Sequence, residues 1–215
     1  MILSCQAILF DLDGVLVDST PAVARVWTRW AHEQGLDPEL VVATAHGRRS
    51  LETIRKLAPH LIAEQENIRV EAMEIAEKDG ITALPGSAEI LRALPPAKFA
   101  IVTSATRALA MARLSYAGLP AVSRIVCADD VINGKPSPEP YLKGAAILGV
   151  LPAHCLVFED TPTGIQAGLA AGMKVVSLFT TYPASELRAA TAIARSLADF
   201  TVANDGEGLR LSFPD

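Results

Sequence analysis

The stretch Ala7-Ile8-Leu9-Phe10-Asp11-Leu12-Asp13-Gly14 is an apolar run that ends in two acidic residues. The four apolar residues predict a short buried strand, and Gly14 allows the chain to turn sharply after it. Residues two apart in an extended segment point to the same side, so Asp11 and Asp13 can serve one site. Because open α/β sheets bind ligands at the carboxyl ends of their strands, we expect a ligand site directly after this strand.

The spacing of Asp11 and Asp13 favours a catalytic use of the pair. Two carboxylates this close repel each other unless a cation lies between them or one of them holds a proton. Asp11 can attack an electrophile beside a Mg²⁺ ion, and Asp13 can pass a proton to and from the leaving and entering oxygens. A turn in which one acid caps and the other is solvated also fits Asp-x-Asp-Gly, so the rest of the chain must decide.

Two further apolar runs end in residues suited to binding an anion. The run 99–102 is followed by Thr103 and Ser104, where a strand turns into a helix. Such a turn presents free backbone N–H groups and the positive end of the helix dipole to a phosphate, and the Thr103 hydroxyl adds a donor. The run 124–128 leads to Lys135 in a proline-rich loop. Ser and Thr also cap helices widely, and a loop lysine can simply be solvated.

A fourth apolar run, 155–158, ends in the adjacent acids Glu159 and Asp160. Mg²⁺ prefers oxygen ligands and retains some of its waters. Asp11, the Asp13 carbonyl and Asp160 therefore form a candidate half-shell for this ion, with Glu159 just outside it. An acid or threonine ahead of a proline is also a good helix cap, so this signal too needs the others.

The ordered set of motifs resembles that of the haloacid dehalogenase-like superfamily over essentially the whole chain. The matching residues are Asp11-Leu12-Asp13-Gly14, Thr103-Ser104, Lys135 and Glu159-Asp160. The resemblance implies a phosphoric monoester hydrolase in which Asp11 forms an aspartyl-phosphate and Asp13 acts as acid and base. The catalytic residues are then Asp11, Asp13, Thr103 and Lys135, the metal ligands are Asp11, Asp13 and Asp160, and Ser104 and Lys135 bind the substrate.

The remaining pattern predicts an α/β fold, a doubly wound parallel sheet with a Rossmann-like core and an inserted small α-helical cap. Strands are expected at 174–178 and 199–202 besides those above. Helices are expected from Ser19 or Thr20, at 38–44, 50–58, 61–78, 87–94, 106–116, 138–148 and 162–171. We assign residues 1–17 and 86–215 to the core and 18–85 to the cap, which forms a hinged lid that excludes water.

The run His46-Gly47-Arg48-Arg49-Ser50 in the cap bears on the substrate. With 58–60 and 134–141, it is similar to the sugar and polyol phosphatase group that includes glycerol-1-phosphatase and 2-deoxyglucose-6-phosphatase. The similarity implies that Arg49 binds a small phosphorylated sugar or polyol. Arg48 stands where glycerol phosphatases can carry an aromatic residue. An exposed helix arginine is the alternative for both, and a contribution of His46 or Glu159 is left open.

Two other functions remain compatible with the pattern. A β-phosphoglucomutase-like phosphosugar mutase shares the core and the cap, but such mutases carry a histidine in the first cap helix where this chain has Val23. A catalytically silent phosphosugar-binding protein would also have this fold. The presence of Asp11, Asp13, Lys135 and Asp160 together favours an enzyme.

Composition excludes several partner classes. The formal net charge is −5 over 215 residues and the basic residues are scattered, so no nucleic acid partner is expected. Neither a signal peptide nor a membrane-spanning apolar stretch is expected.

Cys5, Cys127 and Cys155 show no metal spacing and are interpreted as reduced core residues, which favours a cytoplasmic protein. We expect a monomer or small homo-oligomer.

Overall fold

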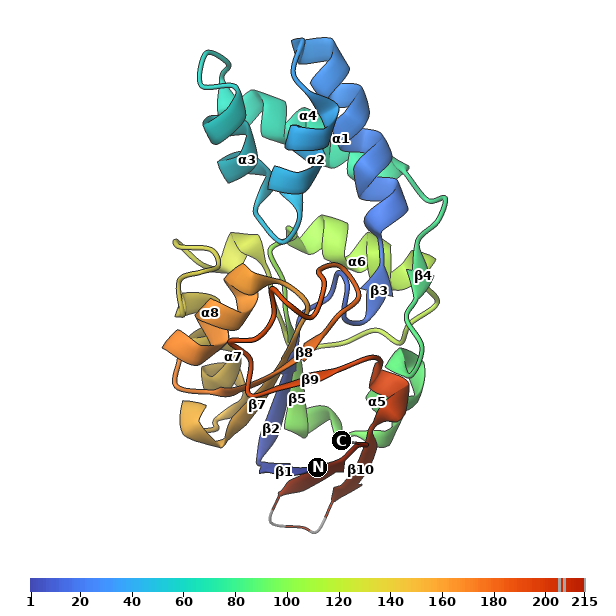
Figure 1. Ribbon diagram of the computed structural model, residues 1–215, viewed down its shortest axis with the longest axis vertical. Helices are drawn as coiled ribbons and strands as arrows, with labels where there is room; N and C mark the ends of the chain where they lie inside the picture. Colours follow the sequence, from blue (N-terminus) through green and yellow to red (C-terminus); the bar gives the residue numbers. More distant parts are fainter. Residues whose placement is uncertain (205, 207, 215) are drawn as a thin grey trace.

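The computed structural model describes residues 1–204, 206 and 208–214, which form an α/β core beneath a group of helices (Figure 1). Within these residues, a six-stranded parallel sheet has the order β6-β5-β2-β7-β8-β9. Its strands are β2 (Ala7–Phe10), β5 (Phe99–Val102), β6 (Ile125–Val126), β7 (Cys155–Glu159), β8 (Lys174–Leu178) and β9 (Ala192–Ala194). The chain proceeds outward from β2 in both directions, so the predicted doubly wound parallel sheet is confirmed.

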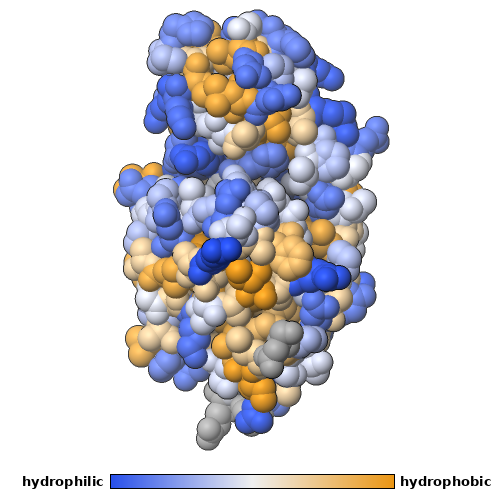
Figure 2. Space-filling view, viewed as in Figure 1, coloured by the Kyte–Doolittle hydropathy of each residue, from blue (hydrophilic) through white to orange (hydrophobic). Residues whose placement is uncertain are grey.

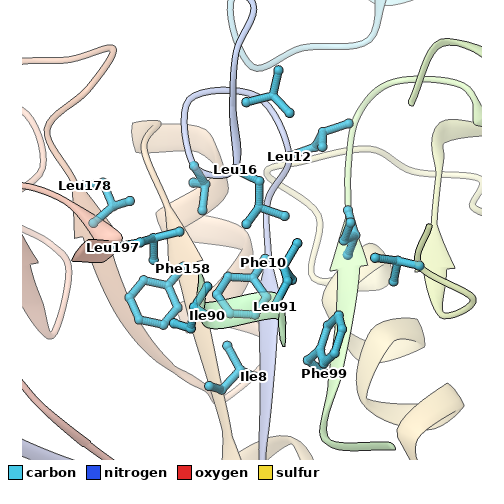
Figure 3. Close-up of a cluster of buried hydrophobic side chains, with 14 of the residues drawn as sticks. Ile8, Phe10, Leu12, Leu16, Ile90, Leu91, Phe99, Phe158, Leu178 and Leu197 are labelled. Carbon is cyan, nitrogen blue, oxygen red and sulfur yellow. The ribbon is translucent and has the colours of Figure 1, made fainter. Parts of the chain in front are cut away.

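Strand β2 lies inside the sheet because all four of its residues are apolar, and each is fully buried. Ile8 and Phe10 belong to the hydrophobic cluster on one face, whereas Ala7 and Leu9 belong to the cluster on the other. Phe10 stacks on Phe158 of β7 with ring centroids 5.3 Å apart, and Figure 3 shows both rings in the first cluster. The packing fixes β2 against β7, and with it the chain that follows each strand.

Helices cover both faces of the sheet and begin close to the predicted positions. Helices α7 (Glu139–Leu148) and α8 (Pro162–Ala170) pack on one face, and α5 (Ser87–Ala93) and α6 (Arg107–Tyr116) contribute to the cluster on the other. Short 3₁₀ helices lie at Pro96–Lys98, Ala128–Asp130, Pro152–His154 and Leu197–Asp199. The helices predicted for the core are thus confirmed.

The expected strand at 199–202 is wrong as a member of the parallel sheet. The strand there is β10 (Thr201–Asn204), which joins β1 (Ile2–Cys5) and β11 (Leu209–Ser212) in a separate antiparallel sheet of order β1-β11-β10. Exposed residues along β10 suit an antiparallel edge strand, whereas a parallel strand between two helical layers must be apolar on both faces. The sixth parallel strand is β9, whose three residues are too few to show a period.

The inserted segment consists of helices α1 (Thr20–Gln34), α2 (Pro38–Ala45), α3 (Ser50–Leu57) and α4 (Ala63–Ala76), as predicted. They enclose a hydrophobic cluster of their own, in which Trp27 and Trp30 meet edge to face at 5.4 Å. Strands β3 (Val17–Asp18) and β4 (Thr82–Ala83) pair and join this segment to the core. The exact division at 17/18 and 85/86 stays a prediction; we call the four-helix segment the cap.

The cap lies over the end of the sheet at which β2 finishes (Figure 1). On the face shown in Figure 2, the surface where cap and core meet is mostly hydrophilic, whereas apolar residues gather lower on the core. The polar surface at this junction is consistent with a ligand site between the two layers. Among the described residues, no helix has both the length and the apolar character needed to cross a bilayer.

The three cysteines of the chain are buried and unpaired. Burial raises the pKa of Cys5 and of Cys127 to about 12 and that of Cys155 to about 11. A thiol with so high a pKa forms very little of the reactive thiolate near neutral pH.

We therefore expect all three thiols to react slowly with an aromatic disulfide reagent at pH 8 in the native protein. Unfolding in guanidinium chloride should make them react completely within the mixing time of a manual assay. A thiol that reacts as fast in the folded protein as in the unfolded protein would show that the cysteine environment described here is wrong.

Candidate active site

The candidate active site lies at the carboxyl end of β2, beneath the cap. Strands β5 and β7 flank β2, so the residues that follow these three parallel strands meet at one edge of the sheet. A cavity at this edge is lined by Asp11, Asp13, Thr103, Ser104 and Asp160, together with cap residues. The structure therefore brings together the predicted residues of three separate motifs.

The turn after β2 is shaped by Gly14. Its φ angle of +78° lies in the left-handed region, and its N–H donates to the Val17 carbonyl at 2.8 Å. A Cβ atom at this position would lie 1.9 Å from Oδ2 of Asp160. Only glycine therefore lets the chain turn here while Asp160 approaches the same backbone.

Asp13 is held on both of its carboxylate oxygens. Ser19 donates its hydroxyl to Oδ1 at 2.6 Å, and Arg113 donates to Oδ2 at 2.7 Å. The sequence predicts a helix that begins at Ser19 or Thr20; Ser19 occupies the N-cap position of α1, but its side chain makes no capping hydrogen bond. The hydroxyl is instead used to orient Asp13.

Lys135 reaches the site from the loop after β6 and is almost completely buried. Its Nζ lies 2.9 Å from Oδ1 of Asp11 and 2.6 Å from Oε1 of Glu159. Tyr141 also donates to Oε1 of Glu159, at 2.9 Å. The other oxygen, Oε2, accepts from the backbone N–H groups of Asp160 and Thr161 and from the Thr161 hydroxyl. Glu159 is therefore an anchor for Lys135 and for the turn after β7.

The electrostatics of this cluster are dominated by buried negative charge. Burial raises the pKa of Asp11 to about 7, although Lys135 opposes the shift. Burial, with the nearby Glu159 and Asp11 carboxylates, raises the pKa of Asp160. Burial would lower the pKa of Lys135, but Asp11 and Glu159 outweigh it and raise that pKa. One ammonium thus faces three carboxylates, and a second cation would balance the charge.

The donor set fits a hard divalent cation such as Mg²⁺. Carboxylate oxygens of Asp11, Glu159 and Asp160 lie within 4.8 Å of one another. Oδ1 of Asp160 is buried and has no hydrogen-bond partner in the described part of the chain. Since both Glu159 oxygens already accept several hydrogen bonds, the available ligands are Asp11 and Asp160, with the Asp13 carbonyl as the third expected from the sequence.

Thr103 and Ser104 occupy the turn between β5 and α6. Oγ1 of Thr103 accepts from the Ala105 N–H at 3.0 Å, and Thr103 is buried. The Ser104 hydroxyl donates to the carbonyl of Gly47 in the cap at 3.2 Å. Both residues line the cavity, where their assignment to catalysis and substrate binding stays a prediction.

Arg49 lies differently from the other predicted site residues. Its guanidinium donates to the carbonyls of Ala128, Val131 and Ile132 at 2.7–2.9 Å. It lines a neighbouring cavity between cap and core, whereas Arg48 and His46 line the cavity that contains Asp11. In this structure Arg49 ties the cap to the loop that leads to Lys135, and its role in substrate binding stays a prediction.

Arg113 and Glu74 also line the cavity, although neither was predicted as a site residue from the sequence. Arg113 lies on the buried face of α6 and bonds to Glu74 on the buried face of α4, with Nη2 3.0 Å from Oε1. Burial raises the pKa of Glu74, and Arg113 opposes that shift. One signal in the sequence could have pointed to Arg113. It shares a helix face with the apolar Leu109 and Ala110, which predicts burial, and a buried arginine requires an acidic partner.

Comparisons with known proteins agree with this geometry. A sequence model described as haloacid dehalogenase-like hydrolase matches residues 5–172. Hexitol phosphatase A of Escherichia coli (strain K12) is 42% identical over 213 residues, covering 95% of this chain and 97% of the relative. Glycerol-1-phosphate phosphohydrolase 2 of Saccharomyces cerevisiae is 38% identical over 193 residues, 84% of this chain and 77% of the relative.

A solved structure of similar architecture is the β-phosphoglucomutase of Clostridium difficile. It superposes with a TM-score of 0.78 at 25% identity and covers 90% of this chain and 92% of its own. The structural likeness extends through both the sheet and the cap helices, because nearly the whole of each chain is included.

Replacing Lys135 by methionine should destabilise the protein by about 3–5 kcal/mol at pH 8, because two buried carboxylates lose their countercharge. The folded pKa of Asp11 is already raised, so its ionisation opposes folding as the pH rises. The loss of stability caused by Lys135→Met should therefore be smaller at pH 5 than at pH 8. Urea unfolding in the presence of EDTA measures the free energy of unfolding at each pH.

The matched control is Lys143→Met, which removes an exposed lysine on α7. It should change the free energy of unfolding little at either pH. Equal losses for Lys135→Met at pH 5 and pH 8 would contradict the electrostatic description of the cluster.

Proposed function

Because the chain belongs to the haloacid dehalogenase-like hydrolases, we propose that it is a Mg²⁺-dependent phosphatase of a small phosphorylated sugar or polyol. The observation that carries the proposal is the contact of Asp11, which lines the cavity, with the buried Lys135, whose Nζ lies 2.9 Å from Oδ1 of Asp11. A carboxylate nucleophile beside a fixed ammonium and a cation-binding group is what attack on a phosphate dianion requires. Asp160 is the cation-binding group of this arrangement.

The reaction proceeds in two displacements at phosphorus. A carboxylate oxygen of Asp11 attacks in line, the bond from phosphorus to the ester oxygen breaks, and Asp13 gives that oxygen its proton. Water then attacks the aspartyl-phosphate, Asp13 takes the water's proton, and the bond between phosphorus and Asp11 breaks to release inorganic phosphate. Ser19 and Arg113 hold Asp13 in one orientation throughout.

Neutralising the phosphoryl oxygens is the main catalytic demand of this reaction. Lys135 supplies a positive charge that Glu159 fixes in place, and the Thr103 hydroxyl and the backbone N–H groups of its turn supply donors. A bound Mg²⁺ would supply further positive charge at the transferring group. Asp11 and Asp160 would hold it, which uses the oxygen of Asp160 that has no hydrogen-bond partner in the described chain.

The roof of the cavity supports a hydroxylated leaving group. His46, Arg48, Ser50 and Glu74 of the cap line it beside the apolar Val23, Trp27 and Ala45, so the alcohol meets several hydrogen-bonding side chains there. Burial lowers the pKa of His46, so its imidazole takes up a proton less readily than that of a free histidine. We place the protein in the cytoplasm, where its buried thiols stay reduced.

A phosphosugar mutase is the less supported alternative. Val23, on α1, lines the cavity with 8% of its surface exposed. A valine cannot exchange a proton with a sugar hydroxyl, whereas the histidine expected there in a mutase can. Hydrolysis is therefore the function that this cavity supports better.

The test is Mg²⁺-dependent phosphate release from a panel of glucitol 6-phosphate, glycerol 1-phosphate and 2-deoxyglucose 6-phosphate. Asp11→Asn should reduce kcat by roughly 10⁴-fold or more, because the nucleophile is lost. Asp79→Asn, an exposed position at the edge of the cap, should retain wild-type activity.

Each alternative has its own outcome. Interconversion of 1- and 6-phosphates without net phosphate release would identify a mutase. Tight binding of the panel without turnover would identify a silent binding protein, and unchanged activity in Asp11→Asn would overturn the mechanism.

A further inference from the structure

We propose that Glu74 and Arg113 recognise the hydroxyl group on the carbon next to the phosphate ester, so that open-chain polyol phosphates are the preferred substrates. The inference rests on the proposed function and assigns its substrate class. The acceptor belongs to cap helix α4 and the donor to core helix α6. The recognising pair therefore exists only when cap and core are together.

The two side chains form a continuous hydrogen-bonded chain with the acid–base residue. Nη1 of Arg113 lies 2.7 Å from Oδ2 of Asp13, and Nη2 lies 3.0 Å from Oε1 of Glu74. The Arg113 and Glu74 side chains are only 7% and 5% exposed, yet both line the same cavity as Asp13. They are thus buried polar groups that face the substrate space.

The position of the leaving oxygen follows from the chemistry. Asp13 must lie within hydrogen-bond reach of that oxygen to protonate it. A hydroxyl on the adjacent carbon lies about one hydrogen-bond length from the leaving oxygen in the gauche arrangement of a 1,2-diol. Arg113 contacts Asp13 directly, so this hydroxyl falls against Arg113 and Glu74.

The pair has unused hydrogen-bonding capacity. A guanidinium carries five N–H groups, and Arg113 uses one from each terminal nitrogen on Asp13 and Glu74. Oε2 of Glu74 has the Ser50 hydroxyl at a long 3.4 Å, and the Glu74 carboxylate also accepts a hydrogen bond from Trp27. A hydroxyl can donate to Glu74 and accept from Arg113. A ring ether oxygen can only accept, and a methylene can do neither.

A purely structural role does not require this pair. Buried ion pairs can often be replaced by apolar residues of similar volume at little loss of stability. A site that is built to bind a hydroxyl, by contrast, discriminates against an analogue that lacks it, because its buried polar groups are left unpaired. The buried charges of Glu74 and Arg113 at the cavity therefore fit recognition of a substrate hydroxyl better than a role in holding cap and core together.

The decisive experiment compares kcat/KM for D-glucitol 6-phosphate and its 5-deoxy analogue. The wild-type protein should prefer the hydroxylated substrate on the order of 10²-fold, the effect of leaving one buried polar group unpaired. Glucose 6-phosphate in its pyranose form, which offers a ring ether oxygen at C5, should fall between the two.

Glu74→Gln is the test variant, because it keeps the shape and replaces the charged acceptor by an amide. It should lower the ratio of kcat/KM for glucitol 6-phosphate to kcat/KM for the 5-deoxy analogue from about 10² toward 1, because the hydroxyl loses its charged acceptor. Glu77→Gln, at the C-cap of the same helix, where Glu77 pairs with Arg25, is the control and should keep the wild-type ratio.

Equal kcat/KM for the two substrates in the wild type would overturn the inference. An equal loss of kcat/KM on both substrates in Glu74→Gln would also overturn the inference. That result would mean that Glu74 only holds the cap against the core. Should Glu74→Gln fold poorly in urea unfolding, Arg113→Lys keeps the buried charge and should still reduce the ratio. The proposed function fails separately, if the wild type releases no phosphate from any substrate.

Discussion

The buried contact of Lys135 with Asp11 and Glu159 is the interaction on which the rest of the site depends. Its three members come from different elements: the turn after β2, the loop after β6 and the end of β7. They can meet only if the parallel strands align at their carboxyl ends, which the stacking of Phe10 on Phe158 helps to enforce. Because one ammonium does not balance this carboxylate cluster, the excess buried negative charge fits the divalent cation that is proposed to bind there.

Several polar contacts of the cap reach the elements of the core that carry the candidate site. Ser104, beside Thr103, bonds to the carbonyl of Gly47, and Arg49 bonds to the loop that leads to Lys135. Arg113 joins Asp13 to Glu74. Since each of these contacts ends on or beside a residue of the candidate site, the cap in this position covers the cavity and fixes groups that the proposed chemistry uses.

Much of this arrangement could be predicted from the sequence, for a physical reason. Asp11, Thr103 and Asp160 each follow an apolar run, so the pattern that gives the strand also places the side chain at its end. The contact of Arg113 with Glu74 could not be predicted, because its partners lie on helices of different layers whose relative position no local pattern encodes. The short strand β9 and the antiparallel position of β10 could not be predicted either, because both depend on pairing with a neighbouring strand, β8 and β11 respectively.

The central claim is that the carboxylate cluster around Lys135 binds a divalent cation. The most direct measurement is a crystal structure with Mn²⁺ in place of Mg²⁺, in which anomalous scattering locates the metal. We expect one peak in contact with carboxylate oxygens of Asp11 and Asp160, with Lys135 still between Asp11 and Glu159. Metal bound elsewhere, or Lys135 turned out to solvent, would contradict this account.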